Sequence, residues 1–333
     1  GKMNSKVFLK GYQWPFDPKK IVGGSSIIDI LVYIETVEKG RRVFLDYREN
    51  PTDFDFHSLE KEAFDYLENS GAFQKTPIAR LKHMNPGAIA LYKDHNIDIT
   101  KDPLEVAVCA QHNNGGLAGN HWWESTNIKH FFPVGEVNGS HGVARPGGSA
   151  LNSGQVGSLR AAEFIANVYD GTDLKMSDFN KAAKAEIEDV LGFLGRCGTS
   201  EFSWRSVRAE LQERMSRAGA HIRSIEVLKT AVKDAKAQVA VLEEQGCKIG
   251  NAASAVQALR NRQLCYAHWV YLSAALYQVN SGVGSRGSAM VRDVSGKRAH
   301  KQLEKKEWSF LPEDPAFKEK VQETVVRDGK IKN

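Results

Sequence analysis

"HGVARPGGSALNSGQ", residues 141–155, contains four glycines, a proline and an arginine within fifteen positions. It leads directly into a segment for which we expect a helix over about residues 152–169. A turn this rich in glycine costs conformational entropy, and a surface loop does not require it merely to change direction. Because glycine lets other groups approach the backbone closely, we expect a ligand beside this turn.

The segments before this turn have the composition of strands. "LEVAVCAQ", residues 104–111, is a short apolar run that predicts a buried strand, and it ends in the polar and glycine-rich "HNNGG". "KHFFPVGEV", residues 129–137, predicts a second strand. A strand, a glycine turn and a helix in this order are typical of a site where a helix N-terminus meets an anion or a cofactor.

The N-terminal third predicts a mixture of helices and strands. Helical spacing of apolar residues predicts a helix over residues 25–39, with Gly40 placed to end it. "RRVFLDY", residues 41–47, has the length and residue types of a strand. Two or three short helices are expected between residues 58 and 95, where glycine and proline interrupt the pattern.

The second half is dominated by long helical patterns without proline. The segments 179–194, 206–245 and 253–278 predict three antiparallel helices of an up-down bundle. The last forty or so residues are polar and rich in charge, so we expect them to wrap a surface, with "KRAHKQLEKK", residues 297–306, as a solvated helix face.

Composition excludes several classes of protein. The 333 residues are 41% hydrophobic and 26% charged, which is typical of a globular protein of roughly two domains. The excess of five basic residues is too small to indicate nucleic-acid binding. The four cysteines form no Cys-x-x-Cys pair, and no apolar run reaches the roughly 20 residues of a membrane span. We therefore expect a protein that is cytoplasmic, or peripheral to the membrane through a partner on the cytoplasmic face of a complex, with no membrane span and no disulfide framework.

Three further motifs are assigned no cofactor or metal. The run from Gly282 to Gly287 matches the G-x-G-x-x-G pattern of dinucleotide-binding sites. Because it follows a predicted helix and not a strand, it is rejected as such a site. Its Arg286 is kept as a candidate side chain that points into a cleft. Four histidines between residues 112 and 141 have spacings that fit no metal-ligand pattern. The pair Trp122-Trp123 is more typical of packing than of a stacking platform.

From spacing alone, Glu136 and Arg145 leave two interpretations open. An acidic residue at a strand end can hold ribose hydroxyls, and glycines at 147 and 148 would let a flat ring lie against the backbone before a helix. The other interpretation is a glycine-rich crossover in which Glu136 and Arg145 form a salt bridge.

The residues "HNNGG" and "FFPVGEVNGSHGVARPGGSALNSGQVGSLRAAEFI" resemble the FAD domain of the succinate dehydrogenase and fumarate reductase flavoprotein family. The resemblance covers roughly residues 104–290 and implies an α+β or α/β fold: a partial FAD-binding domain with a capping-domain remnant, followed by an antiparallel helical bundle. The implied domains are residues 1–103, a capping-domain portion; 104–172, the C-terminal half of the FAD-binding domain; 173–290, the helical bundle; and 291–333, a charged C-terminal tail.

The resemblance also implies roles for individual residues. His112 and Arg145 match the family's substrate-carboxylate contacts, and Glu136 matches its FAD-binding glutamate. The implied cofactor-binding residues are Gly115, Gly116, Gly135, Glu136, Ser149, Ala150 and Leu151. The family's proton-donor arginine has no assigned counterpart, because Arg41, Arg42 and Arg48 cannot be told apart by pattern.

The implied function is hydride transfer between FAD and a small carboxylate of the succinate or fumarate type, with electrons passed to a partner subunit. Pro146 and Ser149 depart from the family pattern, which leaves the carboxylate unidentified. The family's N-terminal dinucleotide-binding element has no counterpart in residues 1–103, so the chain is expected to be a fragment that binds FAD poorly alone. Two alternatives stay open: a non-catalytic helical interaction module, and a flavoenzyme of the same fold acting on an amino acid or an inorganic sulfur compound.

Overall fold

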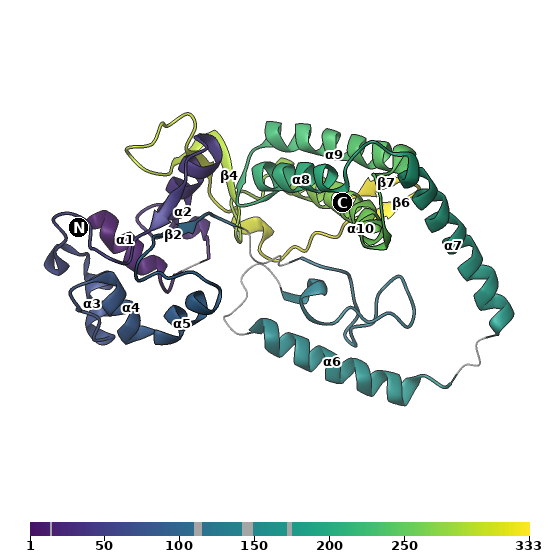
Figure 1. Ribbon diagram of the computed structural model, residues 1–333, viewed down its shortest axis with the longest axis horizontal. Coiled ribbons are helices and arrows are strands. Elements are labelled where there is room, and N and C mark those ends of the chain that lie inside the picture. Colours follow the sequence, from purple (N-terminus) through teal and green to yellow (C-terminus); the bar gives the residue numbers. More distant parts are fainter. Residues whose placement is uncertain (14, 110–114, 142–148, 172–174) are drawn as a thin grey trace. The chain divides into compact units, whose positions relative to one another are not determined.

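The computed structural model describes the whole chain except residues 14, 110–114, 142–148 and 172–174 (Figure 1). The chain divides into two compact units. Unit 1 comprises Gly1–Cys109 and Ser288–Pro312, and unit 2 comprises Ala110–Gly287 and Glu313–Asn333. Both helices and small sheets are present, which confirms a mixed fold class.

Unit 1 is built mainly from short helices. Its elements are α1 (Lys2–Lys10), η1 (Pro18–Lys20), α2 (Ser26–Tyr33), η2 (Ile34–Glu38), β1 (Val43–Leu45), η3 (Phe56–Ser58), α3 (Lys61–Asn69), α4 (Pro77–Met84), α5 (Pro86–Asp94), β2 (Leu104–Val106), β4 (Met290–Arg298) and β5 (Ser309–Leu311). The predicted helix over residues 25–39 is confirmed as α2 followed by the π-helical turn η2. The three short helices expected between residues 58 and 95 are α3, α4 and α5.

The start of each of these last two helices follows from its sequence. At α4 the Thr76 side chain accepts a hydrogen bond from the Ala79 N–H, and Pro77 occupies the first helical position. Asn85 caps α5 in the same way. A capping side chain followed by proline satisfies an orphan N–H and needs no donor from the proline, so these boundaries are set locally.

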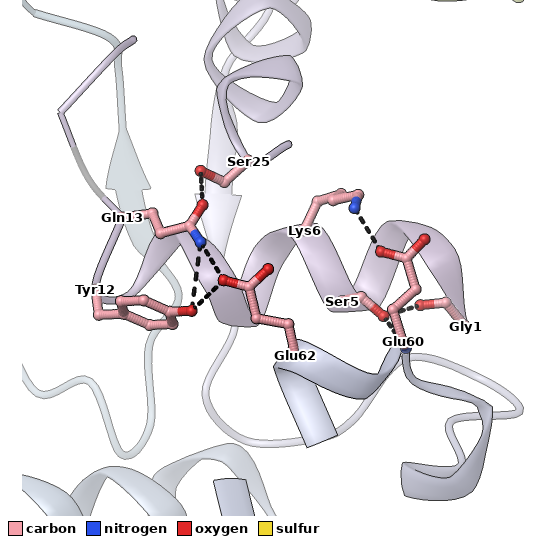
Figure 2. Close-up of polar contacts among 8 residues, drawn as sticks. All are labelled: Gly1, Ser5, Lys6, Tyr12, Gln13, Ser25, Glu60 and Glu62. Atoms are coloured by element: carbon pink, nitrogen blue, oxygen red, sulfur yellow. Dashed lines mark hydrogen bonds and ion pairs between the residues drawn. The ribbon is translucent and has the colours of Figure 1, made fainter. Parts of the chain in front are cut away.

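Polar contacts join α1 to α2 and α3 (Figure 2). Tyr12 and Gln13 both donate to Glu62 of α3, at 2.6 and 2.7 Å. Ser25, just before α2, donates to the Gln13 side chain at 3.2 Å. Beneath this network the apolar side chains of α1 and α3 form a core that includes Leu9, Leu59, Ala63, Leu67 and Ala72.

The prediction of a buried strand over residues 104–111 is wrong in its length and its burial. Among the described residues 104–109 of this range, the strand is limited to Leu104–Val106, which pairs antiparallel with β1, Val43 opposite Val106. Both strands are half-buried or exposed. A two-stranded ribbon has no neighbouring strands on either side to cover it, so an apolar run is not sufficient to bury it.

The prediction of a helix at residues 297–306 is also wrong, whereas the solvent exposure predicted for the segment is confirmed at most of its residues. This segment is the end of β4 and the loop that returns to β5, and the two strands pair antiparallel. Met290, Trp308 and Phe310 are buried. Arg292 lies 4.7 Å above the Trp308 ring and pairs with Glu38 at 3.1 Å. This part of the charged tail therefore belongs to unit 1: the first residues of β4 and of β5 are buried there, while the charged residues between the two strands are mostly exposed.

Unit 2 contains the long helices. Its elements are η4 (Gly135–Val137), η5 (Gly139–His141), α6 (Ser149–Val168), α7 (Met176–Thr199), α8 (Trp204–Arg214), η6 (Met215–Gly219), β3 (Ile222–Arg223), α9 (Ile225–Gln245), α10 (Ala252–Asn280), η7 (Pro315–Phe317), β6 (Val325–Arg327) and β7 (Lys330–Lys332). Helices α9 and α10 lie side by side (Figure 1). The buried core that α7 to α10 share includes Phe193, Cys197, Leu211, Leu242, Cys247, Ala258 and Cys265.

The single helix predicted over residues 206–245 is wrong, because the structure breaks it into α8 and α9. The break follows Gly219, where a β-carbon would lie 2.6 Å from the Met215 sulfur and 2.9 Å from Leu272. Arg223 then donates to the carbonyls of Gly219 and Ala220, both at 2.9 Å. An arginine that satisfies the last carbonyls of a helix stabilises its end, which helical periodicity alone does not reveal.

A buried histidine on α10 makes stability depend on pH. Burial lowers the pKa of His268 to about 4, with a further contribution from Arg214. In the unfolded chain the pKa is about 6.5, so between these values the unfolded state binds the proton and the folded state does not. The contribution of His268 to folding stability is therefore fully present above about pH 6.5, and, because solvent partly screens the ring, we expect about 1–3 kcal/mol to be lost as the pH falls to 4.

Urea unfolding of the wild type and a His268→Leu variant at both pH values checks this expectation. The variant should lack this part of the pH dependence, whereas His95→Gln, at an exposed position, should retain it. An identical pH dependence in wild type and His268→Leu would contradict the assignment.

Candidate functional site

The helix expected after the glycine turn is confirmed as α6, which begins at Ser149, three residues earlier than expected. The residues given for substrate binding, His112 and Arg145, lie outside the part of the chain that the structure describes. The same holds for the Glu136–Arg145 salt bridge, so both interpretations of that pair stay predictions.

The strand predicted over residues 129–137 is wrong. His130 has a φ of +63°, and the segment ends in the 3₁₀ turn η4, whose first residue, Gly135, has a φ of +83°. A residue with a positive φ cannot continue a strand. The conformation of Gly135 is one that only glycine adopts at no steric cost. Glu136 therefore stands on a tight turn, exposed to solvent, and not at a strand end.

A hollow of about 490 Å³ lies between η4 and the first turns of α6. Four of the predicted cofactor residues line it: Gly135, Glu136, Ala150 and Leu151. Its volume is within the range of about 300–1,000 Å³ that is typical of ligand pockets. The structure thus brings the pair Gly135 and Glu136 together with the pair Ala150 and Leu151, which follows at least fourteen positions later in the sequence.

Three lining residues were missed: Gly154, Gln155 and Ser158. With Leu151 they occupy positions i, i+3, i+4 and i+7 of one helix, which is a single helical face. Helical spacing could have identified these three residues from the sequence, because a ligand that contacts Leu151 also lies against the residues on the same face of the helix.

One wall of the hollow, the start of α6, suits an anionic or electron-rich group. The first turn of α6 carries no acidic residue. Unpaired N–H groups and the helix dipole give a helix N-terminus a partial positive charge, which stabilises negative charge nearby. Glu136 lies on the opposite wall, where a carboxylate can accept hydrogen bonds from hydroxyl groups.

Gly116 allows two segments of loop backbone to pack closely against each other. A β-carbon there would lie 2.4 Å from the Val137 carbonyl oxygen, so no larger residue fits. Next to it, Leu117 donates to the Val137 carbonyl at 2.7 Å, and Gly139 donates to the Leu117 carbonyl at 3.1 Å. Neither Gly115, Gly116 nor Ser149 is among the residues that line the hollow, so their roles at a cofactor stay predictions.

The loop before η4 packs along α6 through aromatic side chains. Trp122 stacks on Phe164 at 5.5 Å, and the Arg160 guanidinium lies 4.5 Å above the Trp122 ring. The prediction that the Trp122-Trp123 pair serves packing is confirmed at Trp122. Glu124 accepts a hydrogen bond from Tyr169, just past the end of α6, which holds the pKa of Glu124 below its usual range.

The sequence expectations for Arg286 are met in part. Its G-x-G-x-x-G run does follow a helix, α10. Arg286 donates to the Phe317 carbonyl at 2.7 Å and pairs with Glu313 at 3.2 Å, and both charged side chains are mostly buried. The side chain is therefore engaged by the C-terminal segment, and a role in a cleft stays a prediction.

Each of the three candidate proton-donor arginines has a carboxylate partner in unit 1. Arg41 pairs with Glu35 at 2.6 Å. Arg42 forms two hydrogen bonds with Glu105, and Arg48 forms two with Asp46. Since all three are exposed and paired, the structure does not single out one of them.

The described residues contain neither a cluster of metal-ligating side chains nor a membrane-spanning helix. No group of three or more His, Cys, Asp and Glu side chains there is arranged to hold a metal ion. No helix in that part of the chain is both long and apolar enough to cross a membrane.

Comparison with known proteins gives two curated relatives. No family model matches the chain. Over 143 residues, 42% of this chain and 25% of the relative, it is 33% identical to a fumarate reductase (CoM/CoB) subunit from Methanothermobacter marburgensis. Over 100 residues, 30% of this chain and 18% of the relative, it is 43% identical to an uncharacterized FAD-dependent oxidoreductase of Methanocaldococcus jannaschii. The matched segments span a quarter or less of each relative.

The fold is similar to a chain in a solved structure of quinol-fumarate reductase with menaquinol molecules. The TM-score is 0.56 at 18% sequence identity, and the match covers 88% of this chain and 49% of that chain. At this identity the comparison shows the fold. Together with the curated relatives it confirms the resemblance to the fumarate reductase flavoprotein family that the sequence motifs indicate.

Proposed function

We propose that this chain is part of an FAD-dependent oxidoreductase of the fumarate reductase type, and that the hollow between η4 and α6 holds part of the FAD. The observation that carries the proposal is the convergence of Gly135, Glu136, Ala150 and Leu151 on that hollow. Two curated relatives support it by their names, which specify an FAD-dependent oxidoreductase and a subunit of a fumarate reductase.

The residues present fit such a cofactor. No described residue lies within 4 Å of the position where a β-carbon on Gly135 would stand, so a flat ring or a sugar can approach its backbone from that side. Glu136 would hold FAD hydroxyl groups, and the backbone of Ala150 and Leu151 at the start of α6 would contact the ring, as the family resemblance implies. FAD, when bound, supplies the hydride chemistry.

In this proposal His112 and Arg145 bind the substrate carboxylate. A guanidinium binds a carboxylate with two parallel hydrogen bonds, which fixes its orientation as well as its position. Such fixation converts an encounter into a reactive geometry and lowers the barrier to transfer. The substrate class is a small carboxylate, and electrons pass to a partner subunit; no nucleic acid is involved.

The proposal keeps the predicted domain plan and location. Residues 1–103 are proposed as a capping-domain portion, 104–172 as the C-terminal half of an FAD-binding domain, 173–290 as a helical domain and 291–333 as a charged tail, of which the part up to Pro312 lies in unit 1 and the remainder in unit 2. The protein is proposed to be cytoplasmic and to meet a membrane only through a partner.

A second candidate, a helical interaction module without catalysis, is favoured by one observation. Helix α7 exposes large apolar side chains: Met176, Phe179, Ile187 and Leu191 are each about half exposed or more. Exposed apolar side chains along one helix are typical of a surface that binds a partner. This candidate, a module with a degenerate cofactor fold, predicts no carboxylate-dependent reduction of flavin in any form of the protein and a stable complex through the helices of residues 176–280.

The test is FAD binding by the full-length protein that contains this chain. We expect the yellow flavin absorption to copurify with it, and Glu136→Ala to weaken FAD binding by about 10- to 100-fold, because a hydrogen bond to a charged group contributes about 1.5–3 kcal/mol. Affinity is measured by titrating the flavin-free protein with FAD and following flavin fluorescence.

Glu136→Gln is the matched control, since it keeps the length and one acceptor oxygen of the side chain; it should lose less affinity than Glu136→Ala. A full-length protein that neither retains nor rebinds flavin would overturn the proposed function in favour of the interaction module.

A further inference from the structure

Trp123 adopts a backbone conformation that is unfavourable for its residue type. Its φ is +64°, in the left-handed region that bulky side chains rarely enter. A tight turn imposes this angle: Trp123 donates its N–H to the Asn120 carbonyl at 2.9 Å, and the Asn120 side chain accepts from the N–H of Trp122 and of Glu124. Strain of this kind persists only where the surrounding structure determines it, and it is concentrated at functional sites.

The turn places the Trp123 indole against Gly157 of α6. A β-carbon at Gly157 would lie 2.6 Å from the indole Nε1 and 2.7 Å from Cε2, closer than real β-carbons come to any atom. Gly157 is buried, and the indole nitrogen is buried without an acceptor among the described residues. The indole thus occupies the space that a side chain at position 157 would fill, and it does so at the cost of an unmade hydrogen bond.

This contact lies within one turn of α6 from the candidate FAD hollow. Gly157 is next in sequence to Ser158 and three residues from Gly154, both of which line the hollow, although Gly157 itself is on a neighbouring face of the helix. One turn nearer the start of α6, a β-carbon on Gly154 would lie 3.5 Å from the Gly135 Cα on the opposite wall. The loop and the helix therefore meet at two glycines three residues apart, one in the wall of the hollow and one under Trp123.

We propose that Trp123 is a positioning residue for the FAD site: its indole, seated on Gly157, sets the spacing between the wall that carries Gly135 and Glu136 and the wall formed by α6. The inference rests on the proposed function, because it assigns a purpose to the same hollow. It explains why a strained tryptophan, an indole N–H without an acceptor in the described part of the chain and a helical glycine occur together. Each of these is unfavourable by itself, and each is required if the indole must pack directly on the helix backbone.

The test is Gly157→Ala in the full-length protein. The added methyl pushes the indole away from α6 and widens the hollow, so we expect FAD affinity to fall about tenfold or more and the visible flavin absorption bands to shift. Adding Trp123→Phe to this variant removes Nε1 and shortens the ring, and it should recover most of the lost affinity.

Two further variants separate positioning from general stability. Gly195→Ala, a glycine-to-alanine change on α7 with nothing within 4 Å of the new methyl, should leave FAD affinity and the spectrum unchanged. Trp123→Phe alone leaves space above Gly157, and it should also weaken FAD binding while helix content by circular dichroism stays as in the wild type.

The outcomes distinguish the two proposals. A wild type without flavin overturns the proposed function. A wild type that binds flavin, with Gly157→Ala unchanged in affinity and spectrum, or lowered in thermal stability alone, overturns the positioning role of Trp123 and leaves the proposed function intact. Failure of Trp123→Phe to rescue Gly157→Ala also overturns it.

Discussion

Arg145→Ala is expected to reduce turnover with a small carboxylate by about 1,000-fold while the flavin stays bound. Two hydrogen bonds from a guanidinium to a carboxylate contribute about 1.5–3 kcal/mol each, and every 1.4 kcal/mol is a factor of ten. The assignment of Arg145 to substrate comes from the family resemblance of "HGVARPGGSALNSGQ". Steady-state turnover of the full-length protein and its flavin content, measured on the same preparation, check this expectation.

Arg145→Lys is the matched control for this change. It keeps the positive charge but loses the planar pair of donors, so turnover should be intermediate between that of the wild type and that of Arg145→Ala. Loss of flavin together with activity in Arg145→Ala would place Arg145 at the cofactor. Full activity would favour the interpretation of a structural crossover.

Phe193→Ala is expected to lower the free energy of unfolding of the helical part by about 3–5 kcal/mol. Phe193 is fully buried on α7, and the guanidinium of Arg262 lies 5.0 Å above its ring. The change leaves a cavity and also removes the surface on which this arginine rests. Because a domain has about 5–15 kcal/mol of stability in total, the variant should unfold at a much lower urea concentration.

Ile187→Ala on the same helix is the matched control. Ile187 is 56% exposed, so its truncation should change the free energy of unfolding by no more than about 0.5 kcal/mol. Comparable losses at both positions would mean that α7 is not anchored through Phe193. Urea titrations followed by circular dichroism compare the two variants directly.

The sequence predicted those elements whose signals are local. The helix over residues 25–39, the three short helices in residues 58–95 and the start of α6 are found close to where the pattern placed them. Caps and prolines at Thr76-Pro77 and Asn85-Pro86 act within one turn of chain. Such contacts need no distant partner, so the sequence contains the whole of the physical cause.

The strand predictions failed because a strand depends on a partner that sequence does not specify. "KHFFPVGEV" has the composition of a strand but pairs with no strand among the described residues, and the backbone has positive φ angles at His130 and Gly135. At residues 297–306 the error was the reverse: the charged composition predicted a helix, but the segment begins as the end of strand β4, which pairs with β5. In both cases pairing, not residue type, decided the conformation.

By itself, the sequence determined the family likeness, the position of the helix after the glycine turn, and four residues of the candidate FAD site. Only the tertiary structure decided that these four residues share one hollow, that Gly154, Gln155 and Ser158 complete it, and that Trp123 packs on Gly157 beside it. The physical reason is the separation along the chain between the residues that interact. Helix spacing and glycine turns are effects of neighbours in the chain, whereas a contact between residues 34 positions apart exists only after the loop has folded onto the helix.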